Sequence, residues 1–242
     1  MPVPASVRRV VSLVPSLTES LAVTAPGLLV GATDWCTHPA DLDVARVGGT
    51  KNPAVQDVLD LGPDLVLANE EENRSVDLDR LRAAGVAVWV TAPTTVAAAL
   101  TSLDRMLRLG ARVDRPGWLD EAEDAWAGAA PSDPAWRAVV PIWRRPWMAL
   151  GRDTFAGDVL ARLGVGNVLA GSAERYPRFD PASLPPLDLV VLPDEPYAFS
   201  WADGPEAFPD FPARCVSGRY LTWYGPSLRE APAVLGAQLR QV

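Results

Sequence analysis

Short apolar, β-branched runs alternate with amphipathic stretches along the first part of the chain. The runs predict strands over 9–15, 28–32, 64–69 and 86–92. The intervening stretches predict three helices, which begin at Ser16, where Ser16 and Glu19 fit a capping box, at Pro53 and at Ser75. Strands that alternate with helices are typical of βαβ units and a parallel sheet.

The middle of the chain has a helical period, and the strand signal returns after it. Residues 94–130 predict one helix to about 110 and a second over about 116–129. Further strands are predicted over 136–143, 187–193 and 213–218, and further helices over 153–164, with Asp153 as N-cap, and over 226–242. The Pro-rich segment 195–213 is predicted to be a loop, long enough to cover a site.

This order of elements predicts an α/β protein with two Rossmann-like lobes joined by a helical backbone. The expected boundaries are 1–112 for the N-terminal lobe, 113–134 for the connecting helix and 135–242 for the C-terminal lobe. Two lobes on one connector imply a cleft between them, and small ligands commonly bind in such clefts.

Composition narrows the class of protein. The 242 residues carry a net charge of −8, which disfavours nucleic acid as a partner. No apolar run is long enough to span a membrane. The first residues have neither the pattern of a signal peptide nor a lipid-attachment cysteine, so we expect a cytoplasmic protein, or a periplasmic or extracellular one if a leader has been trimmed. Cys36 and Cys215 are too few for a disulfide framework.

The chain lacks the common signatures of catalysis. It has no nucleophile elbow, no P-loop and no dinucleotide fingerprint, and its glycine-containing segment 164–171 follows a predicted helix and not a strand. With one histidine, a Ser-His-Asp triad is disfavoured. Carboxylates are plentiful, but their spacing selects no acid–base pair. We therefore expect a protein that is not an enzyme.

An ordered set of segments resembles a known superfamily. SLVPSLTESL, VGATDWCTHP, VGGTKNP, LDLGPDLVLAN, RLRAAGVAVWV, PWMALGRDTFAGDVL and TWYGP occur in this order. Together they are similar to the helical-backbone, or class III, periplasmic-binding proteins, most closely to those that bind vitamin B12. The resemblance implies two α/β lobes on a helical backbone, no catalysis, and a corrinoid, haem or iron–siderophore as ligand.

The resemblance also implies site residues. In its B12-binding members, aromatic side chains from both lobes hold the flat corrin ring. The matching aromatic positions in this chain are Trp35, Trp147, Tyr176, Trp223 and Tyr224, and Pro15 falls at a further cleft position in the first strand–helix loop. Two positions that carry tryptophan in the family are Thr50 and Asn69 here, and the charged pair that anchors the nucleotide side falls near Thr222 and Pro226, where it is absent.

Charged residues in the same predicted loops are further candidates. Glu71, Glu72 and Arg74 follow the strand over 64–69, at the ligand-facing end of an open sheet. Lys51, the only lysine, and Arg152 lie in other predicted cleft loops. These side chains either contact a polar edge of the ligand or are solvated surface charges.

His38 is the only histidine and a candidate axial ligand for cobalt or iron. The alternative is a loop histidine that bonds a backbone carbonyl. Because two residues do not make a closed zinc site, Cys36 and His38 alone predict no structural metal.

The leading hypothesis is a non-catalytic binding protein for a corrinoid such as cobalamin, or for a related metal–organic ligand, held in the cleft. One alternative is the substrate-binding component of an ABC transporter for B12, haem or an iron–siderophore. A further alternative is an enzyme or pathway accessory protein that reuses the cleft. Docking to a transporter is doubtful, because the glutamates that dock the exported relatives fall at Gln56 and Ala182.

Overall fold

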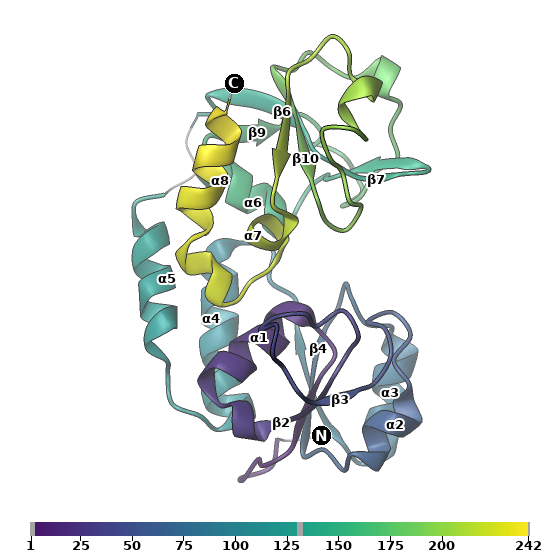
Figure 1. The fold of residues 1–242 in the computed structure, drawn as a ribbon, viewed down its shortest axis with the longest axis vertical. Helices are drawn as coiled ribbons and strands as arrows, with labels where there is room; N and C mark the ends of the chain where they lie inside the picture. Colours follow the sequence, from purple (N-terminus) through teal and green to yellow (C-terminus); the bar gives the residue numbers. More distant parts are fainter. Residues whose placement is uncertain (1–2, 130–132, 242) are drawn as a thin grey trace. The chain divides into compact units, whose positions relative to one another are not determined.

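The computed structural model describes residues 3–129 and 133–241, which form two compact α/β units (Figure 1). Unit 1 contains the residues up to Pro93, Leu100–Asp120 and Tyr224–Pro226. Unit 2 contains Thr94–Ala99, Glu121–Trp223 and the residues from Ser227 onward. Helices α4 (Val96–Arg105) and α5 (Gly117–Ala127) each contribute residues to both units. The predicted two-lobe α/β class is confirmed, whereas the boundaries at 1–112, 113–134 and 135–242 stay a prediction.

The sheet of unit 1 has five parallel strands in the order β3-β2-β1-β4-β5. The strands are β1 (Val10–Ser12), β2 (Leu29–Ala32), β3 (Ala45–Arg46), β4 (Leu65–Asn69) and β5 (Ala87–Thr91). Residues of β1 and β4 are buried throughout, which explains their continuous apolar runs, because helices cover a parallel sheet on both faces. The short strand β3 lies in a turn-rich segment where the pattern predicted none.

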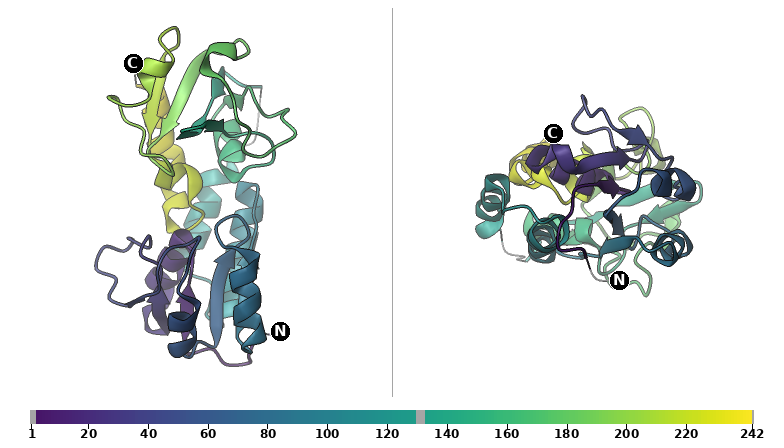
Figure 2. Two further views of the ribbon diagram at one scale, coloured as in Figure 1. Left: turned by 90° about the vertical axis from the view of Figure 1, so that its right-hand side faces the viewer. Right: turned by 90° about the horizontal axis from the view of Figure 1, so that it is seen from below.

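Helices cover both faces of this sheet. They are α1 (Pro15–Thr24), α2 (Val55–Asp60) and α3 (Ser75–Ala83), and α2 and α3 lie together on the face opposite α1 (Figures 1 and 2). Val58 of α2 and Leu78 and Leu81 of α3 pack against Val11 and Val66 in one buried cluster.

The start of α1 differs from the prediction. The helix begins at Pro15, and its N-cap, Val14, makes no side-chain hydrogen bond. Ser16 lies inside the first turn, and its buried hydroxyl has no hydrogen-bond partner among the described residues. Proline fixes a helical φ at the first position, so the helix begins two residues earlier than a capping box with Ser16 as N-cap would place it. The predicted capping box is therefore wrong.

The predicted helix up to residue 110 also changes form. After α4 the chain continues as one π-helical segment, Met106–Ala111, which ends at Arg112 with φ 61°. A Cβ atom on Gly110 would lie 3.3 Å from the Trp89 ring, so glycine lets the segment approach β5 closely. The wider turn keeps Met106 and Leu107 buried.

Unit 2 contains a four-stranded parallel sheet, β11-β10-β6-β9, and an antiparallel hairpin, β7-β8. The strands are β6 (Trp136–Val139), β7 (Pro141–Arg144), β8 (Trp147–Ala149), β9 (Val165–Asn167), β10 (Leu189–Pro193) and β11 (Ala213–Val216). The single strand predicted over 136–143 is thus two strands in different sheets. The chain changes partner at Pro141, which has no N–H to continue a ladder. Strand β9 lies in the glycine-containing segment that predicted no strand.

Helices and a long segment cover the two faces of this sheet. The helices are α6 (Phe155–Arg162), α7 (Gly218–Thr222) and α8 (Ala231–Arg240). The segment predicted as a loop over 195–213 includes a short 3-10 helix, Pro205–Ala207. It packs Phe199 and Phe208 against Val190 and Leu192 of β10, so it forms part of the core of unit 2.

Two predicted helix ends in unit 2 need correction. The N-cap of α6 is Thr154, whose hydroxyl accepts a hydrogen bond from the Gly157 N–H at 3.2 Å. Asp153, the predicted N-cap, precedes it in the left-handed region with φ 51°. The terminal helix predicted over 226–242 is a 3-10 turn, Pro226–Arg229, followed by α8, because Pro232 occupies the first turn of a new helix. In the described part of the chain, no helix combines the length and apolar composition that a membrane crossing requires.

The cap gives a stability prediction. Thr154→Ala removes the hydroxyl that accepts from Gly157 N, so we expect the free energy of unfolding to fall by about 1 kcal/mol in urea denaturation. Thr154→Ser keeps the acceptor and should lose only a small part of that amount. Equal losses in both variants would show that the methyl group, and not the cap, matters.

Candidate functional site

A hydrogen-bond network organises the carboxyl edge of the unit 1 sheet. The Asn69 amide at the end of β4 donates to Tyr224 Oη at 2.6 Å and to Thr91 O at 3.1 Å. Its oxygen accepts the backbone N–H groups of Glu71 and Glu72. Burial raises the pKa of the Tyr224 phenol, which therefore remains a hydroxyl. Tyr224 and Asn69 are buried here, and their polar atoms bond to the protein.

Asn73 extends this network to the neighbouring strands. Its side chain accepts from Asn69 N at 2.8 Å and donates to Leu13 O after β1 and to Thr50 O in the loop after β3. Lys51, in the same loop, donates from Nζ to Glu71 O. The ends of β1, β3 and β4 are thereby joined. Sequence reasoning missed Asn73, although a buried-type strand followed by two asparagines four residues apart is a detectable signal.

Trp35 contrasts with the buried network. It lies in the loop between β2 and β3, and 66% of its surface is exposed. A Cβ atom on Gly49 would lie 3.5 Å from Trp35 Nε1, so the indole lies close to the Gly49 backbone. An exposed indole on this loop offers a rigid, flat apolar face to a ligand.

The other predicted residues of unit 1 lie in or beside these loops. Pro15 is buried at the start of α1, where it begins the helix. His38 is half-buried, with Nδ1 3.1 Å from Thr37 Oγ1. Arg74 is exposed and pairs with the buried Asp77 at 2.8 Å. Among the residues that the structure describes, no three histidine, cysteine, aspartate or glutamate side chains gather as a metal site would require. An axial role for His38 stays a prediction.

In unit 2, Trp147 is part of a packed aromatic cluster. Its ring stacks on Phe199 with centroids 5.9 Å apart and meets Phe208 edge-on at 5.4 Å. The Arg144 guanidinium lies 5.4 Å from the Trp147 ring and forms ion pairs with Asp203 and Glu206. These contacts tie hairpin β7-β8 to segment 195–213. Truncation of Trp147 would therefore disturb the core as well as any ligand contact.

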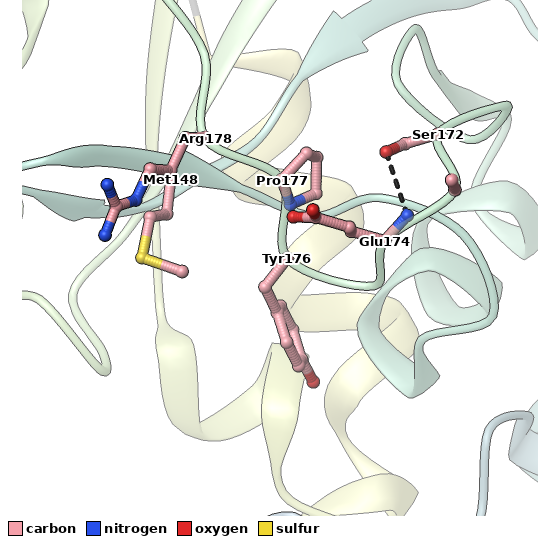
Figure 3. Close-up of a pocket in the computed structure, with 7 residues that line it drawn as sticks. Met148, Ser172, Glu174, Tyr176, Pro177 and Arg178 are labelled. Carbon is pink, nitrogen blue, oxygen red and sulfur yellow. Dashed lines mark hydrogen bonds between the residues drawn. The ribbon is translucent and has the colours of Figure 1, made fainter.

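Tyr176 lines a cavity of about 380 Å³ in unit 2 (Figure 3). Glu174 and Arg178 bring opposite charges to the same cavity, and Met148 adds an apolar wall. The Ser172 hydroxyl accepts from Glu174 N at 3.1 Å, which shapes the turn above Tyr176. Arg152 lies outside this lining, is exposed, and is 3.6 Å from the Asp153 carboxylate. The cavity offers both hydrogen-bond donors and acceptors to a polar group.

Trp223 contacts Glu195, a residue that the sequence did not suggest as part of the site. Trp223 Nε1 donates to Glu195 Oε2 at 2.9 Å, and the Arg219 guanidinium lies 5.8 Å from the Trp223 ring. Burial raises the pKa of Glu195 despite this hydrogen bond. Glu195 follows β10, and a Cβ atom on Gly218 would lie 2.5 Å from Glu195 Cβ, so α7 can begin here only with glycine. Both cysteines, Cys36 and Cys215, are free thiols.

The structure therefore groups the predicted residues into several clusters. Unit 1 gathers Pro15, Trp35, Thr50, Lys51, Asn69, Glu72, Arg74 and Tyr224 at or near the ends of its strands; unit 2 contains Trp147, Arg152, Tyr176 and Trp223. In an open α/β sheet, ligands bind at the carboxyl ends of the strands. Each unit thus has an open parallel sheet with helices on its faces, an arrangement that is typical of proteins that bind small molecules.

Comparison with known proteins identifies the family. The chain matches the periplasmic binding protein family over residues 10–184. It is 24% identical over 180 residues to the vitamin B12-binding protein of Yersinia pestis, a match that covers 70% of this chain and 63% of that protein. The chain thus spans less than two thirds of the length of the curated relatives it matches.

Solved structures share the fold. The periplasmic vitamin B12 binding protein BtuF of Vibrio cholerae superposes with a TM-score of 0.75 at 18% identity and covers 98% of both chains. The periplasmic heme-binding protein RhuT from Roseiflexus sp. RS-1 superposes with a TM-score of 0.73 at 21% identity, over 96% of this chain and 98% of that one. Because the family match covers more than half of the sequence, the chain belongs to the periplasmic binding protein family.

The raised pKa of Glu195 gives a pH-dependent prediction. A carboxyl group with a raised folded-state pKa favours the folded state when protonated, and this contribution is lost as the pH rises above the ordinary glutamate pKa of about 4.3. Glu195→Gln stays neutral and can still accept from Trp223 Nε1. We expect the variant to gain free energy of unfolding relative to wild type between about pH 4 and pH 7.

Urea denaturation at a series of pH values measures this difference. Glu174→Gln, which removes an exposed carboxylate in the same unit, reports the effect of net charge. A difference between Glu195→Gln and wild type that stays constant with pH would contradict the assignment.

Proposed function

We propose that this protein is a non-catalytic binding protein for a corrinoid such as cobalamin, or for a related planar metal–organic ligand. The observation that carries the proposal is Trp35, an indole that is largely exposed on a loop whose backbone is tied to the carboxyl edge of a sheet. A flat macrocycle buries a large apolar face, and an exposed indole provides a rigid surface of the same kind. Family relatives that are named for B12 and heme binding support this ligand class.

Unit 2 supports the same class of ligand through its polar cavity. The cavity beside Tyr176 presents the carboxylate of Glu174 and the guanidinium of Arg178. A group with both a donor and an acceptor, such as the carboxamides at the edge of a corrin, suits this pair of charges. A carboxylate, such as a haem propionate, would pair with Arg178 alone and be repelled by Glu174.

A transporter role is the second candidate, favoured by membership of the periplasmic binding protein family. Gln56, on α2, and Ala182, in the turn Pro181–Ser183, are both exposed and carry no charge. Neither side chain is a carboxylate, so neither could form the glutamate–arginine ion pair that the resemblance implies for docking to a permease. The cytoplasmic location stays a prediction, and fractionation of the native cells with an antibody to this protein would test it.

Titration with hydroxocobalamin tests the proposed function. We expect saturable quenching of tryptophan fluorescence, with dissociation constants in the micromolar range or below, and no chemical change in the recovered ligand. Haemin is the parallel ligand, because the fold accommodates proteins named for either group. Absence of saturable binding to both ligands would overturn the proposal.

Trp35→Ala tests the site itself. Loss of a stacked indole should weaken hydroxocobalamin binding by about 1–3 kcal/mol, with little change in the free energy of unfolding because the side chain is exposed. Trp201→Ala is the matched control, since Trp201 is 64% exposed but lies in segment 195–213. Equal affinities of wild type and Trp35→Ala would remove Trp35 from the site.

A further inference from the structure

The loop that carries Trp35 is tied down by one guanidinium. Arg46, at the end of β3, donates from Nη1 to Thr33 O and to Cys36 O, both at 2.9 Å. Its Nη2 donates to Leu42 O at 3.2 Å. Thr33 and Cys36 lie in the first part of the loop and Leu42 in its second part, so one side chain connects both parts. A lysine could not hold all of them, because it lacks the planar fork of donors.

The same loop is anchored at a second point on the side of α1. Cys36 follows Trp35 directly and is completely buried. Its Sγ lies 3.0 Å from Thr18 Oγ1 of α1 and 3.2 Å from Thr33 Oγ1. Burial raises the pKa of the Cys36 thiol, so it remains a neutral, packed group. Trp35 is therefore an exposed residue whose chain neighbour is fixed in the core.

Backbone hydrogen bonds on either side of Trp35 complete the restraint. Asp34 N donates to Gly48 O at 2.9 Å, and Thr37 N donates to Trp35 O at 3.0 Å. Because these bonds already restrain the loop, ligand binding to the Trp35 side chain costs little conformational entropy. The restraint lies entirely within unit 1.

We propose that Arg46 is a positioning residue for ligand binding: it holds the Trp35 loop, residues 33–46, as a preformed platform that Cys36 anchors to α1. The inference rests on the proposed function, because it assigns a role to the indole that the ligand contacts. It adds a residue that was not among the predicted site residues.

Two variants and a matched control test whether Arg46 contributes to ligand affinity. Arg46→Met removes the donors but keeps most of the stem, and Arg46→Lys keeps the charge with a single donor group. Arg9→Met is the control, because the Arg9 guanidinium also donates to a backbone carbonyl, Leu61 O, at 2.8 and 2.7 Å, outside the platform. We expect Arg46→Met to bind hydroxocobalamin at least fivefold more weakly than wild type, Arg46→Lys to be intermediate, and Arg9→Met to be unchanged.

A double-mutant cycle separates positioning from general destabilisation. If Arg46 acts through Trp35, Arg46→Met should cause no further loss of affinity in a Trp35→Ala background. A loss of the same size in both backgrounds would overturn the proposal, as would unchanged affinity of the single Arg46→Met variant.

Cys36 provides a direct readout of the loop without any ligand. In a Cys215→Ser background, reaction with an aromatic disulfide reagent reports opening of the loop, because the Cys36 thiol is buried in the closed form. We expect Arg46→Met to raise the reaction rate by about tenfold or more, since hydrogen bonds to a charged donor are lost, and Arg9→Met to leave it unchanged. Hydroxocobalamin should slow the reaction in the wild-type loop.

The outcomes separate the two proposals. If the wild-type protein binds neither hydroxocobalamin nor haemin, the proposed function fails and the platform role fails with it, whatever the thiol shows. If wild type binds and the Cys36 rate does not respond to Arg46→Met, the proposed function stands and the platform is overturned.

Discussion

Unit 1 depends on the hydrogen bonds of one buried amide. Strands of a parallel sheet end together, and the polar backbone of the loops that follow must find partners out of water. Asn69 provides them: it donates to Thr91 O and to Tyr224 Oη, and it accepts the N–H groups of the turn after β4. A chain segment more than a hundred residues away in sequence is thereby fixed to this sheet edge. A tryptophan at this position could not make these bonds.

Aromatic side chains have different roles in the two units. Trp35 is exposed on a restrained loop and is available to a flat ligand. Trp147 stacks on Phe199 and packs against Phe208, so most of its interaction energy goes to the core of unit 2. The resemblance to B12-binding proteins implies the same role for both residues. Burial distinguishes them, and it makes Trp35 the clearer probe of binding.

Polar side chains that are not fully buried set the remaining details of the site edges: Glu195 is half-buried and Arg46 is exposed. Glu195 is held by Trp223 Nε1 after β10, in a position where burial raises its pKa. Arg46 crosses the Trp35 loop and donates to the carbonyls of Thr33, Cys36 and Leu42. In both cases a side chain from one segment forms hydrogen bonds with the backbone or the indole of another segment. Such pairs give a loop a single conformation without regular secondary structure.

Periodicity and turn residues by themselves determined the α/β class and most strands of the two parallel sheets. These features follow from local chemistry: apolar runs must be buried, and glycine and proline end elements. Tertiary structure decided the division of residues 136–143 between two sheets, the packing of segment 195–213 into the core, and the hydrogen bonds that Asn69, Arg46 and Glu195 make to other segments. Their partners lie far away in the chain or on another element, and no local pattern records which side chain arrives there.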